Sequence, residues 1–321
     1  MTGKRKRVAV VGAAGIGKHH ANWWHIEGAE VCAVAGTSAE SVAKAEAGLR
    51  ALFPYNGRGY TSLATLLERE RPDIVDICSP PGLHYEHTRE ALQSGCDVLC
   101  EKPFVYRPGA SSEDLLREAN ELIALSRKKR SRLGLCVQYL LGARLFADMW
   151  RARFPEKPIE SFWMHLEVPA RGRPADPERI WADLAPHPLS AVQALCLDGE
   201  LNADSIEVEA GDYKVSAQFE VGNPGCNSVK CAITVSNSLD PPGYVREMRL
   251  NGYPFCVEGA TDDKGVYCTR IRTPDSVIRV PDLMRSTLRA FLDNCPTAGP
   301  EAALVNTEWL LRISELGGVR R

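Results

Sequence analysis

The sequence predicts an α/β Rossmann domain, a parallel doubly wound sheet, followed by an α+β domain with a large, mostly antiparallel sheet. In the first third of the chain, short apolar runs alternate with helical patterns, as in right-handed βαβ units with a parallel sheet. In the last third, apolar and polar residues alternate one by one, which is typical of antiparallel strands with one buried face. A chain of 321 residues is also too long for one ordinary core and suits two domains.

Four apolar runs in the first part predict buried strands, and the periodic segments between them predict helices. The predicted strands cover residues 8–11, 30–35, 73–78 and 97–100, and the predicted helices cover residues 19–28, 39–52, 61–70, 85–94 and 111–130. Basic residues close the last of these helices, where cations suit the negative end of the helix dipole.

The alternating pattern begins after the middle of the chain, at Val215, Ala217, Phe219 and Val221, and recurs at residues 229–235. Further strands are predicted at residues 245–250, 255–258, 266–271 and 277–280, and two closing helices at residues 283–294 and 301–314. The change of pattern places a domain boundary between residues 136 and 137.

The composition excludes several classes of protein. Lysine and arginine total 39 against 41 aspartate and glutamate residues, which gives a formal net charge of −2. This balance argues against a nucleic-acid partner and against an anionic membrane surface, since both usually require excess positive charge. No apolar run approaches the ~18 residues of a membrane span. Residues 8–17 follow a basic stretch as in a secretion signal, but the segment is short and glycine-rich and no cleavage site follows it.

The 11 cysteines include no C-x-x-C pair, which argues against a zinc site or a redox motif, and no metal is expected. Reduced, mostly buried thiols in a cytoplasmic protein are the simplest account of them.

The first predicted strand leads into a glycine-rich turn and then a helix. The turn consists of Gly12, Ala13, Ala14, Gly15, Ile16 and Gly17. It matches the dinucleotide fingerprint G-x-G-x-x-G, except that Ala14 replaces the second glycine. Gly12 permits the tight turn, Gly17 lets the helix pack closely on the strand, and the helix N-terminus offers N–H groups to phosphates. The turn therefore predicts bound NAD or NADP, the alternative being a turn that packs a helix without a ligand.

The end of the second strand indicates which dinucleotide is preferred. An Asp or Glu normally follows this strand and binds the adenosine ribose. Here Gly36, Thr37 and Ser38 follow it, with no carboxylate to repel a 2′-phosphate. Thr37 and Ser38 can donate hydrogen bonds to such a phosphate, and Lys44 can add charge. NADP is therefore slightly favoured over NAD, although no arginine stands in the usual place.

The most specific pattern lies between residues 72 and 105. A strand there ends in Ser79, Pro80 and Pro81, then comes His84, and the following strand ends in Glu101, Lys102 and Pro103. Together with the turn at Gly12, this pattern resembles the glucose–fructose oxidoreductase, inositol dehydrogenase and MocA family. The resemblance is dense up to residue 105 and sparse beyond it.

The resemblance implies an NAD(P)-binding Rossmann domain at residues 1–136. Residues 137–321 would then be an α+β domain for substrate binding and oligomerisation, in which the large sheet often forms the interface of a homo-oligomer, a dimer or tetramer. It also implies a sugar, polyol or sugar derivative as substrate. The implied cofactor contacts beyond the first turn are Thr37, Ser38, Ser79, Pro80, His84, Glu101 and Lys102.

Lys102 follows the carboxyl end of a predicted parallel strand, where ligands of open α/β sheets bind. An ammonium group there can donate a hydrogen bond to a substrate oxygen and stabilise charge that develops on it. The alternative is a structural pair with a neighbouring carboxylate such as Glu101.

The segment from Asp183 to Ser190 resembles the family pattern D-x-G-x-H-x-x-D. His187 can exchange a proton near neutral pH, and Asp183 can orient it and bind substrate hydroxyls. Prolines on both sides of His187 are tolerated only in a first helical turn, so a helix is predicted to begin near Ala185. Ala185 replaces the family glycine and Ser190 replaces the last aspartate, which weakens the expectation of an ordinary polyol substrate. The alternative for His187 is a structural bond at a helix start.

Four further residues are weaker candidates for substrate contacts. These are Gln138, Tyr139, His165 and Arg171. Arg171 and the nearby Arg173 can recognise a carboxylate or phosphate, but solvated loop charges explain them equally well.

The resemblance thus implies an NAD(P)-dependent dehydrogenase that moves a hydride to or from a secondary alcohol or ketone, with His187 as acid/base. Two alternatives remain open at this point. One is a reductase of C=N bonds in biosynthesis, and the other is a catalytically silent regulator that senses a sugar or dinucleotide. A purely structural interaction protein has no positive feature in its favour.

Overall fold

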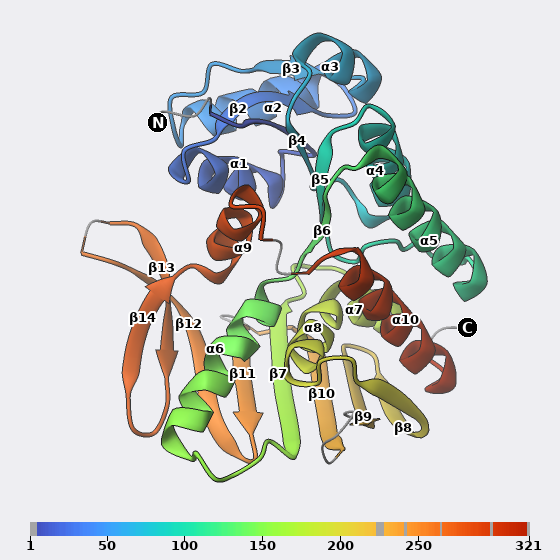
Figure 1. Cartoon of the computed structure of the whole chain (residues 1–321), viewed down its shortest axis with the longest axis vertical. Helices are drawn as coiled ribbons and strands as arrows, with labels where there is room; N and C mark the ends of the chain where they lie inside the picture. Colours follow the sequence, from blue (N-terminus) through green and yellow to red (C-terminus); the bar gives the residue numbers. More distant parts are fainter. Residues whose placement is uncertain (1–4, 223–227, 241–242, 264, 296–297, 320–321) are drawn as a thin grey trace. The chain divides into compact units, whose positions relative to one another are not determined.

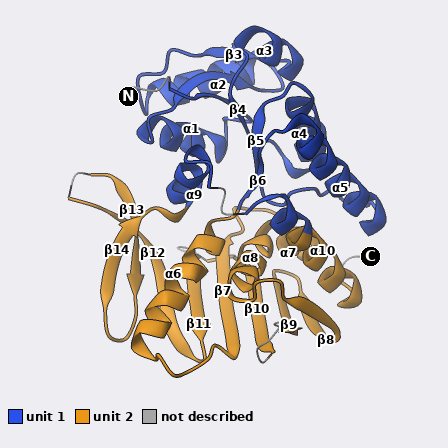
Figure 2. Cartoon of the chain, in the orientation of Figure 1, with its two compact units in different colours: residues 1–136, 284–304 blue, residues 137–283, 305–321 orange. Residues whose placement is uncertain are grey.

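The computed structural model describes residues 5–222, 228–240, 243–263, 265–295 and 298–319. The chain forms two compact units (Figure 2). The first unit contains residues 1–136 and 284–304, and the second contains residues 137–283 and 305–321. No described helix is long and apolar enough to cross a membrane.

The first unit is built on a six-stranded sheet in the order β3-β2-β1-β4-β5-β6, with all strands parallel (Figure 1). The strands are β1 (Arg7–Val11), β2 (Glu30–Ala35), β3 (Arg58–Tyr60), β4 (Ile74–Ile77), β5 (Asp97–Glu101) and β6 (Leu133–Cys136). This order is that of a doubly wound Rossmann sheet, so the prediction of the first fold is confirmed.

Helices follow the strands of this sheet, and the serine residues placed before three of them explain where they start. They are α1 (Gly17–Ile26), α2 (Ala39–Arg50), α3 (Leu63–Glu70), α4 (His84–Gln93) and α5 (Ser112–Lys129). The hydroxyls of Ser38, Ser62 and Ser111 accept backbone N–H groups in the first turns of α2, α3 and α5.

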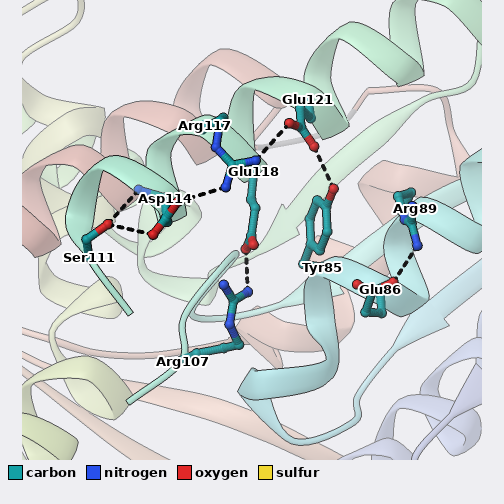
Figure 3. A network of polar contacts seen from close by, with 9 residues as sticks. All are labelled: Tyr85, Glu86, Arg89, Arg107, Ser111, Asp114, Arg117, Glu118 and Glu121. Atoms are coloured by element: carbon teal, nitrogen blue, oxygen red, sulfur yellow. Dashed lines mark hydrogen bonds and ion pairs between the residues drawn. The ribbon is translucent and has the colours of Figure 1, made fainter. Parts of the chain in front are cut away.

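Polar contacts link α4, α5 and the segment that precedes α5 (Figure 3). The hydroxyl of Tyr85 donates to Glu121 at 2.6 Å, and Arg107 pairs with Glu118 at 2.5 Å. Arg117 bridges Asp114 and Glu121 along one exposed face of α5. The exposed pairs of Arg117 contribute little stability each, so the buried face of α5 holds the helix in place.

The first unit also includes α9 (Leu283–Leu292) from its second residue onward, a segment that the sequence had assigned to the second domain. The reason lies in contacts with β6. The ring of Phe291 packs where Gly134 has no side chain, and the guanidinium of Arg132 lies 4.6 Å from the centre of that ring. The N–H of Leu135 also donates to the carbonyl of Ala298 at 2.9 Å. The chain therefore leaves the first unit after Cys136 and returns to it after Leu283.

The second unit contains an eight-stranded sheet in the order β14-β13-β12-β11-β7-β10-β9-β8. Its strands are β7 (Ser161–Pro169), β8 (Glu200–Gly211), β9 (Lys214–Gly222), β10 (Val229–Ser238), β11 (Val245–Leu250), β12 (Tyr253–Thr261), β13 (Tyr267–Arg272) and β14 (Val277–Pro281). Only the pair of β7 and β10 is parallel among the described pairs. The prediction of a mostly antiparallel sheet is confirmed.

Helices pack on one face of this sheet, which we call the helix-covered face. They are α6 (Gln138–Arg153), α7 (Pro177–Leu184), α8 (Pro186–Leu195) and the part of α10 (Pro300–Leu316) that belongs to this unit. On β7, Met164 and Leu166 are buried in the core beneath these helices, whereas Trp163 and His165 point to the opposite, outer face and are partly exposed. The alternation along the strands thus separates a packed face from an outer one.

Candidate functional site

A cavity of about 460 Å³ lies in the first unit at the carboxyl ends of the strands, where the sheet order reverses between β1 and β4. Open α/β sheets bind their ligands at this point. Seven predicted cofactor contacts line it, namely Gly12, Ala13, Ala14, Gly15, Thr37, Ser79 and Pro80. The other predicted contacts in the described chain, Ile16, Gly17, Ser38, His84, Glu101 and Lys102, are not among its lining residues.

The glycines after β1 make this turn possible and leave room beside it. Gly12 has a φ of +89°, and a Cβ there would lie 2.6 Å from the carbonyl oxygen of Cys78. A Cβ on Gly17 would lie 2.6 Å from the carbonyl oxygen of Gly12, so only glycine lets α1 begin this close to β1. A Cβ on Gly15 would meet nothing within 4 Å. The backbone of the turn is therefore open to a ligand at Gly15.

The N-terminus of α1 differs from those of α2, α3 and α5. No side chain caps it, and Ile16 holds the capping position. Its first backbone N–H groups therefore lack the serine oxygen that serves α2, α3 and α5, as do those of α4. An uncapped helix start beside an open glycine turn fits the pyrophosphate of a dinucleotide, which needs N–H donors and close backbone approach.

At the end of β2, Thr37 and Ser41 line the cavity, whereas Ser38 serves its own helix. The Ser38 hydroxyl accepts the N–H of Ser41 at 3.1 Å, and the Ser41 hydroxyl donates to the Ser38 carbonyl at 2.8 Å. Lys44 is exposed on α2. None of the described lining residues is Asp or Glu, so no carboxylate is set to bind a ribose diol or to repel a 2′-phosphate here.

His84 is buried and positions two loops instead of lining the cavity. Its Nδ1 lies 2.7 Å from the carbonyl oxygen of Pro103, and its Nε2 lies 2.8 Å from that of Ser79. Burial lowers the pKa of His84, and the two carbonyl groups only partly offset this. His87, one helical turn later, does line the cavity, with Nδ1 2.9 Å from the hydroxyl of Ser79.

Glu101 takes part in a buried charge cluster with His20 of α1 and Asp76 of β4. Nδ1 of His20 lies 2.9 Å from Oδ2 of Asp76, and Nε2 lies 3.2 Å from Oε1 of Glu101. Trp24 donates its indole N–H to the same oxygen of Asp76 at 2.6 Å. Burial lowers the pKa of His20, but the two carboxylates raise it more, to about 10. The raised pKa favours an imidazolium at neutral pH, whose two ring nitrogens face the two carboxylates.

Lys102 directly follows β5 in the first unit and is partly buried. Its backbone N–H donates to Oε2 of Glu101 at 3.2 Å, so the buried charge cluster holds the residue that precedes the lysine. The lysine thus stands at the carboxyl end of a strand of the Rossmann sheet, as the sequence predicted.

Asp183 and His187 belong to the second unit and stand on successive helices. Asp183 is in the last turn of α7 and lies 3.9 Å from the guanidinium of Arg173. His187 is in the first turn of α8, which begins at Pro186 after Ala185, so the prediction of a helix start near Ala185 is confirmed. The hydroxyl of Ser190 donates to the His187 carbonyl at 2.6 Å, which commits Ser190 to the helix.

The weaker candidates are dispersed over the second unit. Tyr139 is buried, and its ring meets that of His187 edge to face with centroids 5.6 Å apart. Gln138 precedes it at the start of α6 and is partly buried. His165 points to the outer face and lies 3.1 Å from the hydroxyl of Ser236, so the structure does not bring it beside His187. Arg171 is exposed and donates to the hydroxyl of Tyr244 at 2.9 Å.

Several features of the site were not predicted from the sequence. The cavity also involves Ser41, Thr61, Leu63 and His87, and the buried charge cluster involves His20, Asp76 and Glu101. For His87 a signal existed, since it lies one helical turn after the histidine of the Pro-Pro-x-x-His motif. For the others, the strand order had to be known first.

A family model described as an oxidoreductase family with an NAD-binding Rossmann fold, that of glucose–fructose oxidoreductase, inositol dehydrogenase and MocA, matches residues 6–136. The expected resemblance is thereby confirmed over this part. The chain is 32% identical to D-glucoside 3-dehydrogenase of Escherichia coli over 131 residues, which are 39% of this chain and 35% of that protein. It is 34% identical to inositol 2-dehydrogenase of Renibacterium salmoninarum over 137 residues, 42% of this chain and 38% of that protein. The chain thus spans little more than a third of these relatives.

Solved structures resemble the whole chain in fold. UDP-N-acetylglucosamine 3-dehydrogenase from Acidithiobacillus ferrooxidans has a TM-score of 0.69 at 18% identity, covering 97% of both chains. Scyllo-inositol dehydrogenase from Lactobacillus casei, solved with NAD(H) and scyllo-inositol, has a TM-score of 0.70 at 13% identity, covering 98% of this chain and 97% of that one. At such identities the likeness establishes the fold alone and nothing about the ligands.

Proposed function

We propose that this chain, which over residues 6–136 belongs to the oxidoreductase family with an NAD-binding Rossmann fold, is an NAD(P)-dependent dehydrogenase of a sugar, polyol or sugar derivative. The observation that carries the proposal is the cavity of the first unit. It joins an open glycine turn to an uncapped helix start at the switch point of the sheet, with Lys102 at the end of a neighbouring strand. Two relatives whose names state a substrate, the glucoside and the inositol dehydrogenase, support the substrate class.

The residues of the chain divide the work as follows. When bound, the dinucleotide supplies or accepts the hydride. The glycine turn and α1 hold its pyrophosphate, and the Lys102 ammonium donates a hydrogen bond to the substrate oxygen and stabilises negative charge on it. His187 takes the hydroxyl proton during oxidation and returns it during reduction, while Asp183 orients the substrate.

NADP is the favoured dinucleotide in this proposal. Thr37 lines the cavity at the end of β2 and can offer its hydroxyl there, and no described lining residue presents a carboxylate. A homo-oligomer formed through the large sheet, and a reducing, cytoplasmic environment that suits the free thiols of the described cysteines, belong to the same proposal.

The test separates nucleotide binding from chemistry. NADPH and NADH are titrated against tryptophan fluorescence, and hydride transfer is then followed by nicotinamide absorbance with a panel of ketoses, sugars and polyols. Gly12→Ala should abolish nucleotide binding, because its Cβ would meet the Cys78 carbonyl at 2.6 Å. Gly28→Ala is the matched control, since Gly28 has a similar φ of +87° but open space around it. Nucleotide binding without hydride transfer to any member of the panel indicates a silent regulator and contradicts the proposal.

A further inference from the structure

A second cavity, of about 430 Å³, opens in the second unit over β11, β12 and β13. Its lining includes Tyr244, Arg246, Gly259 and Tyr267. Arg246 stands two residues before the buried Met248 on β11, so it shares the helix-covered face with the core. The cavity therefore continues the face of the sheet on which His187 and Tyr139 pack.

The charges around this cavity are distributed unequally. On the outer face, Arg249 pairs with Glu247 at 2.8 Å, and Arg270 and Arg272 both pair with Glu258 at 2.5 Å. Glu258 borders the cavity, but its carboxylate is committed to those two arginines. Within the described chain, no carboxylate forms an ion pair with Arg246.

Arg171 is exposed and donates at 2.9 Å to the hydroxyl of Tyr244, which is one of the lining residues. It too lacks an ion pair with any carboxylate that the structure describes. Burial lowers the pKa of Arg246, but the phenols of Tyr139 and Tyr267, the hydrogen bond with Tyr267 and the charge of Asp282 raise it more, so the guanidinium stays charged. Arg246 is therefore a charged lining residue of this cavity that forms no ion pair in the part of the chain that the structure describes.

Tyr139 connects Arg246 with the proposed acid/base. Its hydroxyl is buried and has no hydrogen-bond partner among the described residues. Burial raises the pKa of its phenol and the charge of Arg246 lowers it, and its ring lies edge to face against that of His187. A buried hydroxyl without a partner destabilises the protein, and a polar group of a ligand can offset that cost.

Gly259 gives the cavity its shape. A Cβ at this position would lie 2.3 Å from the hydroxyl of Tyr267, so the phenol can lie across β12 only because the residue is glycine. The backbone of Gly259 has no positive φ, and alanine would therefore strain nothing except the position of the Tyr267 side chain. The Tyr267 hydroxyl is thus held beside Arg246 as a second donor.

We propose that Arg246, assisted by Tyr267, binds an anionic group of the substrate, so that the substrate is an acidic sugar or polyol carrying a carboxylate or a phosphate. A planar guanidinium beside a phenol is the pair of donors that recognises such groups. The inference rests on the proposed function, because it assigns this cavity to the substrate of that reaction.

The experiment measures binding by isothermal titration calorimetry to the protein saturated with NADP⁺. The probes are D-glucuronate, glucose 6-phosphate and, as neutral controls, D-glucose and myo-inositol. At least one of the two acids should bind roughly tenfold or more tightly than the neutral probes, the size of one charged hydrogen bond. The acid that binds more tightly shows whether the site prefers a carboxylate or a phosphate.

Variants assign the effect to the cavity. Arg246→Met should weaken binding of the preferred acid roughly 10- to 100-fold and leave neutral probes unchanged. Arg249→Met removes the same charge from the outer face of the same strand and should change neither the binding of the acid nor that of the neutral probes. Gly259→Ala moves only the Tyr267 phenol and should weaken binding of the preferred acid several-fold. This variant keeps the proposal testable even when Arg246→Met does not fold.

The inference is overturned when neither acid binds more tightly than its neutral counterpart, or when Arg246→Met weakens acids and neutral probes alike. Hydride transfer is measured separately with the same compounds. Transfer with neutral polyols and no preference for acids overturns this inference and leaves the proposed function intact. Arg246-dependent binding of an acid without any transfer overturns the proposed function and leaves the anion site.

Discussion

The imidazolium of His20 connects three elements of the first unit, because it stands on α1, while Asp76 is on β4 and Glu101 ends β5. Three buried charges with a net charge of −1 are tolerated only because each carboxylate faces the ring or another donor. Glu101 directly precedes Lys102, so the position of the proposed catalytic lysine depends on this cluster.

Replacing His20 with glutamine should destabilise the protein strongly. The variant leaves two buried carboxylates without their cation, which typically costs about 3–5 kcal/mol. Urea unfolding followed by tryptophan fluorescence measures the change. His19→Gln, one residue earlier and exposed, is the control, and its free energy of unfolding should stay close to that of the wild type. A His20→Gln variant of wild-type stability would show that the cluster contributes no net stabilisation.

The same cluster predicts a pH dependence. The folded-state pKa of His20, about 10, is raised above its ordinary value of 6.5. A raised pKa stabilises the folded state fully below 6.5, and this contribution disappears as the pH rises through about 10. The difference in unfolding free energy between wild type and His20→Gln should therefore shrink from pH 6.5 to pH 10. A difference that stays constant over that range would contradict a charged His20.

His187→Ala should slow turnover by ~10²–10⁴-fold, the usual contribution of a general acid/base. Lys102→Ala should also slow turnover, because a cation at the reacting oxygen acts mainly in the transition state. Affinity for NADPH should change little in either variant, since the glycine turn carries most of the nucleotide binding. Single-turnover hydride transfer at saturating cofactor is the measurement. A near-normal rate of His187→Ala at all pH values would mean that another group moves the proton.

At this scale, local motifs were readable from the sequence and long-range pairs were not. Lys102 and His187 stand in short segments whose residue types are characteristic, so they could be singled out without a structure. His20 pairs with carboxylates that are far away in the sequence, and no sequence pattern predicts such a pair before the strand order is known. Arg246 sits in an ordinary alternating strand, and only the ion pairs of its neighbours distinguish it.

Among the elements, the segment from β2 into α2 carries the cofactor preference. Unmodified protein should bind NADPH more tightly than NADH, because Thr37 lines the cavity there and no described lining residue is a carboxylate. Thr37→Asp should reverse the order roughly tenfold or more by repelling the 2′-phosphate. An acid at Gly36 tests this less cleanly, since a Cβ there would lie 2.8 Å from the Ser41 hydroxyl and disturb the helix cap.

Fluorescence titration of both nucleotides measures the preference. Ala47→Asp adds the same charge to an exposed position of α2 and should leave the order of the two affinities unchanged. Tighter binding of NADH by the unmodified protein would contradict the predicted preference for NADP. It would not contradict the prediction that the glycine turn binds a dinucleotide.

Elements with a strong period were predicted and irregular ones were not. The apolar runs of β1, β2 and β5 and the alternation of β9, β10 and β11 are visible in the sequence. β3 has only three residues and includes Arg58 and Gly59, so it has no apolar run to read. β6 lies where the two patterns meet, and α9 joins the first unit through the fit of Phe291 beside Gly134, a contact between segments far apart in the chain.

For the whole molecule, the remaining expectation concerns assembly through the outer face of the eight-stranded sheet. Residues of β7 that point outward are only partly exposed, and Trp163 lies there with the guanidinium of Arg249 4.5 Å from its ring centre. An indole held on an otherwise charged sheet is the kind of side chain that anchors interfaces. Light scattering coupled to size exclusion should therefore find a dimer or tetramer. Trp163→Glu should shift it toward the monomer, whereas Ile26→Glu, at a 41% exposed apolar position of the first unit, should not. A wild-type monomer, or an oligomer indifferent to Trp163→Glu, would move the interface away from this face and leave the outer arginine pairs as ordinary solvated charges.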